Sequence, residues 1–301
     1  AFLVPNSLGS VVLGWASALI FSHLLRSSNY SYRYTYYSFV VAHLFGFYWL
    51  VNTISIFGNF PYWAALITYI LFIFTNSLYS LVIPFLLRHF PNRFRTLFLD
   101  IPIAVCVAEF IAIRIFPWTL GHTQIAFTQF AQVSDIAGVT TVTFVLLWLS
   151  SAMERVISSR KIILETLLPV ALFLLSIFYG MNSINQYSAF DAAAHRVVVV
   201  QGNIPIADKH SDMLFRHNIE VYNDLSKGYE SPDTLIIWPE TVVMSALPEA
   251  IANNRRLNFL SPTPKWLVGS LIYDSNDNYY NSAIGVNTGA VAFDLYHKLI
   301  L

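Results

Sequence analysis

The chain has 301 residues, of which 56% are hydrophobic and 11% charged, whereas an average soluble domain is about 45–50% apolar and about 25% charged. This composition favours a membrane protein. The formal net charge is zero, so we expect no nucleic-acid partner. A single cysteine, Cys106, excludes an intrachain disulfide. No Cys/His cluster has zinc-site spacing, and we expect no metal or cofactor.

The charge differs between the two parts of the chain. Residues 1–187 carry nine Lys/Arg and five Asp/Glu, and residues 188–301 carry eight and twelve. A basic, apolar segment therefore precedes an acidic one that has the composition of a soluble domain. We predict a membrane domain at 1–187 and a second domain at 188–301.

Six apolar runs are long enough to cross a bilayer core, which needs about 20 residues of helix. The predicted spans are 8–25, 36–57, 62–87, 97–116, 136–153 and 162–180. The fourth is the least regular, because it contains Asp100, Glu109 and Arg114. Glu109 and Arg114 are either a structural ion pair or a functional pair, and the sequence leaves both readings open. We expect His43 and Cys106 to be packed core residues.

The loops between the spans predict the orientation, because Lys and Arg accumulate on the cytoplasmic side. Alternate loops hold Arg26 and Arg33, then Arg88, Arg93 and Arg95, then Arg155, Arg160 and Lys161. The opposite loops, 58–61 and 117–135, hold none. The start of the chain and the segment from Tyr187 onward are therefore predicted outside the cytoplasm, which in a bacterium is the periplasm or the cell exterior.

The second domain shows short β-rich runs separated by polar turns. We predict a strand that starts at Arg196 and ends at Gly202, a helix at 211–228 with Ser211 as N-cap and Gly228 as its stop, and a strand at 234–238. An irregular region around Pro248 with a short helix follows, then a strand at 266–273 and two strands around Asn287-Thr288-Gly289. This order indicates an α/β domain.

Glu240 directly follows the strand 234–238, where α/β sheets place ligand-binding residues. Pro239 restricts the backbone before the carboxylate, and Trp238 is expected to desolvate it, which suits a general base. The alternative is a polar residue that merely ends a strand. Lys298 follows the last predicted strand, and by itself it is equally consistent with a solvated lysine.

Four segments taken together resemble bacterial apolipoprotein N-acyltransferases. They are VQGNIP at 200–205, LIIWPET at 235–241, YYNSA at 279–283 and YHK at 296–298. Segments 45–61 and 116–124 of the membrane part are also similar to segments of that family. The resemblance implies a polytopic α-helical membrane domain followed by part of an α/β (αββα, nitrilase-like) extracytoplasmic domain.

The resemblance also implies site residues and a reaction. Glu240 matches the family's catalytic glutamate, as general base, and Lys298 matches its catalytic lysine, as oxyanion stabiliser. The third member of this triad is a cysteine beyond the lysine, and the chain ends at Leu301. We therefore expect a chain truncated at both ends, without the nucleophile and inactive by itself.

The implied reaction moves a fatty acyl chain from a phospholipid, with phosphatidylethanolamine as the expected donor, to the cysteine. The acyl chain then passes to the N-terminal amine of a diacylglyceryl-cysteine lipoprotein. The implied location is the bacterial inner membrane. The chain departs from the family pattern at two places. His210 stands where the family often has Trp, which weakens the expected lipid contacts of that loop. Leu299-Ile300 follows the lysine where His-Leu is common, which weakens the assignment of Lys298.

Two rival functions remain open. A membrane-bound nitrilase-like amidase would use the same residue types with water as the acceptor. A non-catalytic membrane protein would keep the fold and bind a partner. A transporter is disfavoured, because no paired, interrupted spans stand out.

Overall fold

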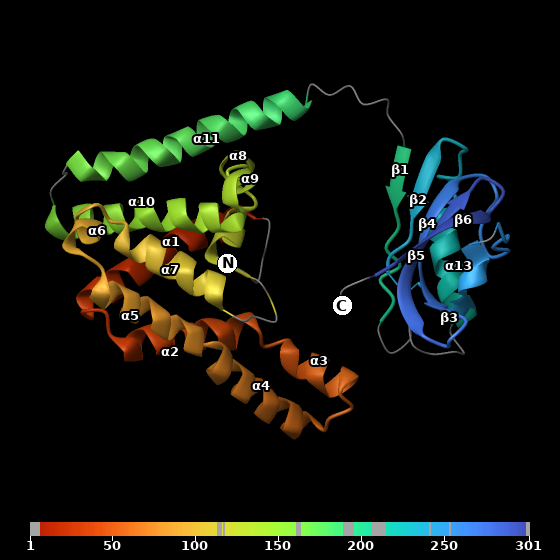
Figure 1. Ribbon diagram of the computed structural model, residues 1–301, viewed down its shortest axis with the longest axis horizontal. Coiled ribbons are helices and arrows are strands. Elements are labelled where there is room, and N and C mark those ends of the chain that lie inside the picture. Colours follow the sequence, from red (N-terminus) through yellow and green to blue (C-terminus); the bar gives the residue numbers. More distant parts are fainter. Residues whose placement is uncertain are drawn as a thin grey trace. The chain divides into compact units, whose positions relative to one another are not determined.

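The computed structural model describes residues 7–112, 116, 118–160, 164–188, 196–205, 215–240, 242–252 and 254–298. The chain divides into two compact units, Ala1–Phe190 and Asp191–Leu301. Unit 1 is helical, and unit 2 is built around a sheet (Figure 1). This is the predicted order of a helical membrane domain followed by an α/β part.

Unit 1 begins with helices α1 (Leu8–Ser27), α2 (Tyr32–Gly46), α3 (Leu50–Phe57), α4 (Tyr62–Asn76), η1 (Leu78–Leu81), α5 (Val82–His89) and α6 (Asn92–Thr96). It continues with α7 (Asp100–Ile111), η2 (Leu120–Gln124), α8 (Thr128–Ala131), α9 (Ser134–Ala137), α10 (Val139–Ser159), η3 (Leu164–Thr166) and α11 (Leu167–Ser188).

Among the described residues, four helices are long and apolar enough to span a membrane: Leu8–Ser27, Tyr62–His89, Val139–Ser159 and Leu164–Tyr187. The pair Tyr32–Gly46 and Leu50–Phe57, bent by 61°, makes a fifth if it is counted as one span. The predicted span 97–116 contains α7, a helix of 12 residues, and description stops at Ala112. The chain is a multi-pass membrane protein, and the count of six spans stays a prediction.

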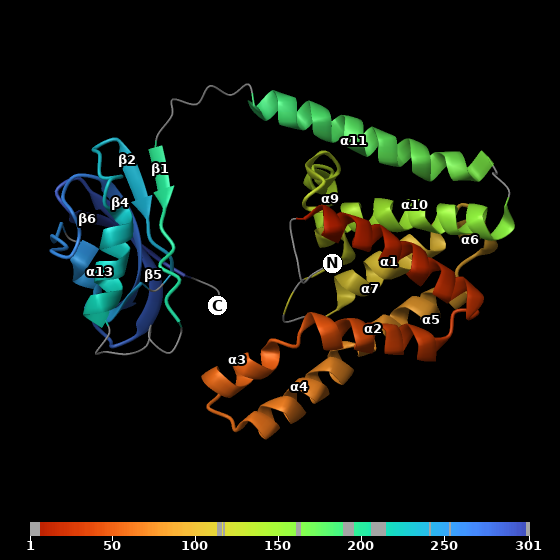
Figure 2. The ribbon, with the colours of Figure 1, turned by 180° about the vertical axis from the view of Figure 1, so that it is seen from behind.

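Helices α1, α7 and α10 pack together at the centre of unit 1 (Figure 2). The buried residues of α1 are mostly small and recur about every fourth position: Ser10, Gly14, Ala18, Ser22 and Leu25. Small residues let membrane helices approach closely. A Cβ added at Gly14 would collide with the side chains of Thr123 and Gln124, and the Ser22 hydroxyl lies 3.3 Å from that of Ser151 on α10.

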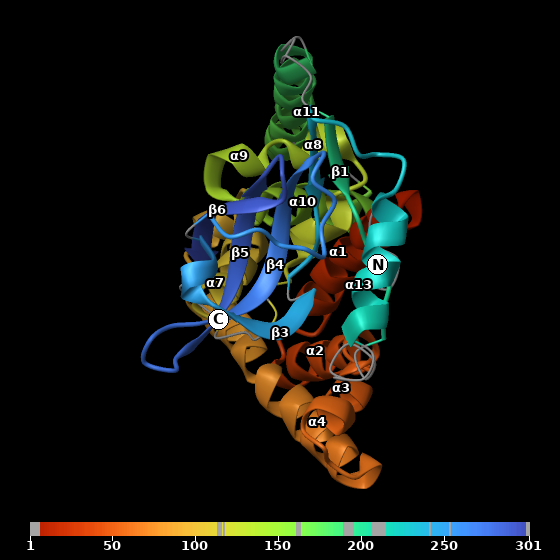
Figure 3. The ribbon, with the colours of Figure 1, turned by 90° about the vertical axis from the view of Figure 1, so that its right-hand side faces the viewer.

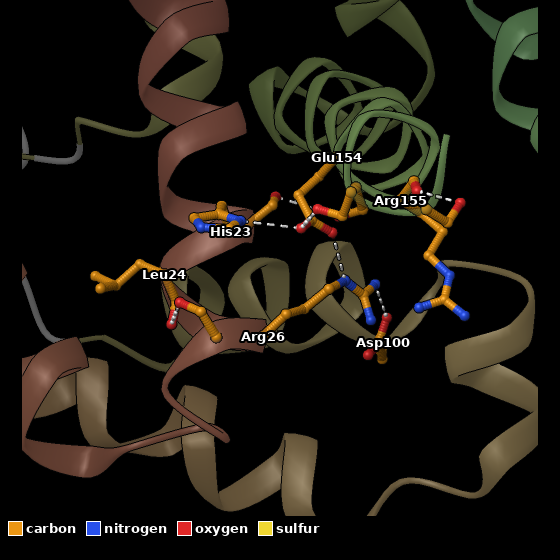
Figure 4. A network of polar contacts seen from close by, with 11 residues as sticks. His23, Leu24, Arg26, Asp100, Glu154 and Arg155 are labelled. Atoms are coloured by element: carbon orange, nitrogen blue, oxygen red, sulfur yellow. Dashed lines mark hydrogen bonds and ion pairs between the residues drawn. The ribbon is translucent and has the colours of Figure 1, made fainter. Parts of the chain in front are cut away.

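A network of charged side chains joins the same three helices at the end predicted to be cytoplasmic (Figure 4). Arg26 of α1 contacts Asp100 of α7 at 3.2 Å and Glu154 of α10 at 3.5 Å. His23 Nδ1 lies 3.1 Å from Glu154 Oε1. Asp100 and Glu154 are buried, so their charges depend on this pairing. From the sequence, Arg26 was predicted only as a charged residue of a cytoplasmic loop, and its contacts with Asp100 and Glu154 were not predicted.

Unit 2 contains β1 (Arg196–Val199), α13 (Phe215–Ser226), β2 (Thr234–Ile237), β3 (Val243–Pro248), η4 (Glu249–Ala252), β4 (Lys265–Tyr273), β5 (Tyr279–Asn287) and β6 (Val291–His297). The strand order is β1-β2-β4-β5-β6, and β3 also pairs with β4. Strands β1, β2, β3 and β4 pair in parallel, whereas β5 and β6 are antiparallel to their neighbours.

Helix α13 lies beside the sheet (Figure 3). Its residues Ile219 and Tyr222 belong to the same buried cluster as Ile236, Trp238 and Trp266. This cluster is the hydrophobic core of unit 2.

The predicted elements of unit 2 are largely confirmed. The strands, the helix and the hairpin near Gly289 are found, and Gly228, with φ +85°, follows the end of α13. The predicted N-cap Ser211 lies outside the described residues. The irregular region before Pro248 is in fact strand β3. Among the described strands it pairs with β4, through a long-range contact whose register shifts between Val243 and Leu247.

Candidate functional site

Glu240 lies in the connection between β2 and β3, and both of these strands pair with the same neighbour, β4. Ile237 of β2 pairs with Leu267, and Val243 of β3 pairs with Ser270. Five residues of the connection therefore stand opposite only two residues of β4. The connection therefore contains more residues than can pair with β4 at this point, and Glu240 is one of them.

Trp238 anchors the start of this connection in the core. Its backbone N–H donates to Leu267 O at 2.9 Å, and its indole N–H donates to Ser226 Oγ at 3.1 Å. Its ring lies 5.3 Å from that of Trp266, and the residue is 2% exposed. The Glu240 side chain is 59% exposed. The expectation that Trp238 desolvates Glu240 is wrong, because the ring packs inward between α13 and the sheet.

Lys298 contacts Glu240. Lys298 Nζ lies 3.2 Å from Glu240 Oε1, although 58 residues separate them in the chain. Lys298 follows the end of β6, and its backbone N–H donates to Asn281 O of β5 at 2.9 Å. The pairing of β5 with β6 thus fixes the backbone position of Lys298.

Asn281 completes the arrangement, and the sequence analysis did not identify it as a site residue. Its side-chain N–H donates to the same Glu240 oxygen, Oε1, that Lys298 approaches. The backbone carbonyl of Asn281 holds Lys298, and the side chain of Asn281 holds Glu240. Its place within the segment YYNSA was the available signal. We name Glu240, Asn281 and Lys298 the acid–amide–lysine cluster.

The chemistry of this cluster follows from its residue types. A carboxylate that accepts two hydrogen bonds on one oxygen is fixed in orientation, and an ammonium beside it can stabilise a developing oxyanion. Both charged side chains remain open to a ligand, since Lys298 is 43% and Glu240 59% exposed. The geometry suits proton transfer next to a cation. The catalytic roles of Glu240 and Lys298 stay predictions.

His297 belongs to a separate set of contacts. Its Nδ1 lies 2.7 Å from Ser282 Oγ, and its Nε2 lies 3.5 Å from Glu249 Oε1. His297 and Ser282 are direct partners in the β5–β6 register. Because side chains alternate along a strand, His297 and Lys298 point to opposite faces. These contacts tie β6 to β5 and η4 next to the cluster.

The other candidate residues lie in unit 1 or outside the described residues. Glu109, 7% exposed, accepts a hydrogen bond from Leu120 N at 3.1 Å. His43 Nδ1 lies 2.8 Å from Ser77 Oγ, and the thiol of Cys106 donates to Thr140 O at 3.7 Å. Each of these three side chains therefore contacts another segment of unit 1.

Arg114 and His210 fall outside the described residues. Within the part of the chain that the structure describes, no three His, Cys, Asp or Glu side chains are grouped so that they could hold a metal ion.

Comparison with known proteins gives a consistent result. Residues 1–152, just over half of the chain, match the family model described as apolipoprotein N-acyltransferase N-terminal domain. Three curated relatives are named apolipoprotein N-acyltransferase. The Geobacter metallireducens protein is 24% identical over 64% of this chain and 39% of its own length. The Vibrio cholerae protein is 26% identical over 84% and 52%, and the Haemophilus ducreyi protein 22% identical over 97% and 57%.

The chain spans about half the length of the Vibrio cholerae and Haemophilus ducreyi proteins and 39% of the Geobacter metallireducens protein. All three matches extend beyond residues 1–152, because they cover 64%, 84% and 97% of the chain. The resemblance drawn from short motifs is confirmed by the family model and by these relatives. The chain belongs to the apolipoprotein N-acyltransferase family.

Proposed function

We propose that the whole protein transfers a fatty acyl chain from a phospholipid, by way of a cysteine thioester, to the N-terminal amine of a diacylglyceryl-cysteine lipoprotein. Phosphatidylethanolamine is the proposed donor. The observation that supports this proposal is the acid–amide–lysine cluster, in a chain that belongs to this family. The proposal concerns the whole protein, because the chain spans about half the length of its relatives.

In the first step, Glu240 takes the proton of the cysteine thiol, and the thiolate attacks an ester carbonyl of the phospholipid. Lys298 stabilises the negative charge on the carbonyl oxygen. The ester bond breaks, and the lysophospholipid leaves as an alcohol that takes the proton back from Glu240. The acyl chain is then held on sulfur as a thioester.

In the second step, the lipoprotein amine attacks the thioester carbonyl and loses a proton to Glu240. The C–S bond breaks, and the thiolate is protonated again. Asn281 would act as a positioning residue throughout, since it holds the Glu240 carboxylate. Neither step needs a metal or a nucleotide.

The proposed location is the bacterial inner membrane, with unit 2 on the periplasmic side. The support is the distribution of Lys and Arg, which cluster in alternate loops of unit 1 and are lacking at 58–61 and 117–135. Both proposed substrates are anchored in a bilayer, so a multi-pass domain suits the reaction. The orientation is tested with a reporter enzyme that works only in the cytoplasm, fused after residue 187. Activity of this reporter would contradict the orientation.

The proposed transfer is tested with the complete protein, purified and supplied with phosphatidylethanolamine and a diacylglyceryl lipopeptide with a free amine. We expect an N-acylated lipopeptide and a lysophospholipid in equal amounts, detected by mass spectrometry. Release of free fatty acid or ammonia without lipopeptide acylation would instead establish the amidase alternative. Binding of lipopeptide without either product would indicate a non-catalytic protein.

A further inference from the structure

A cavity of about 510 Å³ lies within unit 1, between α1, α2, η1, α7, η2 and α10. It lies apart from the acid–amide–lysine cluster in sequence, because its lining residues fall between Ser17 and Leu147. Binding sites for small molecules in proteins are typically about 300–1,000 Å³. The cavity is therefore large enough for a ligand.

The cavity runs from the outer surface of unit 1 to its core. Ile20 of α1 and Phe45 of α2 line it and are 67% and 65% exposed. Val105 of α7 and Leu147 of α10 also line it, and they are 4% and 0% exposed. Helices α1 and α10 are long and apolar enough to span a membrane. The open side therefore faces the region that bilayer lipid occupies.

Most hydroxyl groups of the lining donate to backbone carbonyls of the protein. The Ser17 hydroxyl donates to Leu13 O at 2.6 Å, and the Ser38 hydroxyl donates to Tyr34 O at 2.7 Å. Thr123 Oγ1 donates to Leu120 O at 2.7 Å.

Three further polar side chains of the lining have partners within unit 1. Thr119 Oγ1 lies 3.0 Å from His122 Nδ1, and His43 Nδ1 lies 2.8 Å from Ser77 Oγ. Glu109 accepts from Leu120 N. Because the lining is mostly aliphatic and aromatic, it favours a hydrocarbon chain over a lipid headgroup.

Contacts between aromatic rings fix the side-chain positions in one wall of the cavity. Phe47 stacks on Trp118 with centroids 5.5 Å apart, and Phe39 meets Tyr79 edge to face at 5.4 Å. All four residues line the cavity. An apolar space of this kind does not hold water well, and its walls lose dispersion contacts if it is empty.

We propose that this cavity binds one acyl chain of a glycerophospholipid from the surrounding bilayer, which enters past Ile20 and Phe45 while the headgroup stays outside the cavity. The occupant is assigned from the exposed rim and the mostly apolar lining. The inference does not depend on the reaction proposed above, because binding requires neither Glu240 nor Lys298.

The test is photo-crosslinking of the chain in nanodiscs that contain a phosphatidylcholine with a diazirine in its acyl chain. Crosslinked peptides are mapped by mass spectrometry. We expect crosslinks at the buried floor residues Val105 and Leu147. We also expect crosslinks at Leu71 of α4, which is 60% exposed, does not line the cavity and reports on lipid around the protein.

Two variants fill the cavity. Ala42 and Gly46 of α2 both line it, and a Cβ at Gly46 would meet no atom within 4 Å. Ala42→Phe and Gly46→Leu should lower the floor crosslinks several-fold and leave those at Leu71 unchanged. The matched control is Val41→Phe, which adds bulk at a 52% exposed position outside the lining. It should change neither set of crosslinks.

Three outcomes would overturn the inference. They are crosslinks at Leu71 without any at the floor, floor crosslinks that neither filling variant reduces, and floor crosslinks from a diazirine fatty acid but none from the phospholipid. Acylation activity is not measured in this experiment. A failure of the proposed reaction therefore leaves the result unaffected, and a failure here leaves the proposed reaction standing.

Discussion

Trp238 is expected to stabilise unit 2 through core packing, and not to act on Glu240. Truncation to Ala at a fully buried Trp costs about 3–5 kcal/mol of unfolding free energy, and Trp238 is 2% exposed between Tyr222 and Trp266. Trp238→Phe keeps most of the ring but loses the hydrogen bond to Ser226 Oγ, which costs about 1–2 kcal/mol. Ser226 keeps its bond to Tyr222 O at 2.7 Å, so the loss is limited to one interaction.

The assay is pulse proteolysis of the full chain in detergent over a series of urea concentrations, with the unit 2 fragment quantified. Lys265→Ala is the control, because its exposed side chain at the start of β4 should change the free energy by less than about 0.5 kcal/mol. A cost below about 1 kcal/mol for Trp238→Ala would refute the packing role.

Three further predictions concern charged and polar contacts. Asp100→Asn should lower the unfolding free energy of unit 1 by about 1–3 kcal/mol, because it removes one of the two buried carboxylates that Arg26 contacts and leaves only Glu154. Thermal unfolding in detergent measures the loss, and Arg155→Met, at an exposed position, is the control. A loss no larger than that of the control would contradict the network. Hydrogen bonds, chiefly from the Asn278 side chain, lower the pKa of Asp274 from 3.8 to about 2. A depressed carboxyl pKa stabilises the folded turn above about pH 4, and this stabilisation is lost as the pH falls towards about 2. Hydrogen exchange at the Asn278 amide should follow that change in the wild type but not in Asp274→Asn, and identical profiles would refute it. Asn281→Ala in the complete protein should slow acyl-enzyme formation, whereas Asn281→Gln should restore part of the rate. Equal rates for Asn281→Ala and the wild type would remove Asn281 from the site.

Much of the fold was predictable from local pattern. The strand 265–273 and the hairpin around Gly289 carry strong β-rich runs and a left-handed glycine, and the helix 215–226 has apolar residues at helical spacing. Strand β3 was missed, because its pairing with β4 is a long-range contact with an irregular register. The bend between α2 and α3 was missed for a similar reason: both halves are apolar, and hydropathy reads them as one span.

The candidate site was only partly predictable. Glu240 and Lys298 stand at strand ends, which the sequence shows, but their 3.2 Å contact depends on how β3, β4, β5 and β6 pair. The role of Asn281 depends on a side-chain hydrogen bond across the sheet, and no spacing rule reveals it. The inward position of Trp238 is likewise a tertiary property, set by α13 and Trp266.

The measurement that tests the central claim most directly is thioester formation by the complete protein with Glu240→Gln. The variant keeps the shape of the side chain but cannot accept a proton as a base. General bases contribute about 10²–10⁴ in rate, so we predict at least about a 100-fold slower acyl-enzyme formation with membrane insertion and unfolding unchanged. A near-normal amount of acyl-enzyme at a near-normal rate would contradict the assignment of Glu240 as the base.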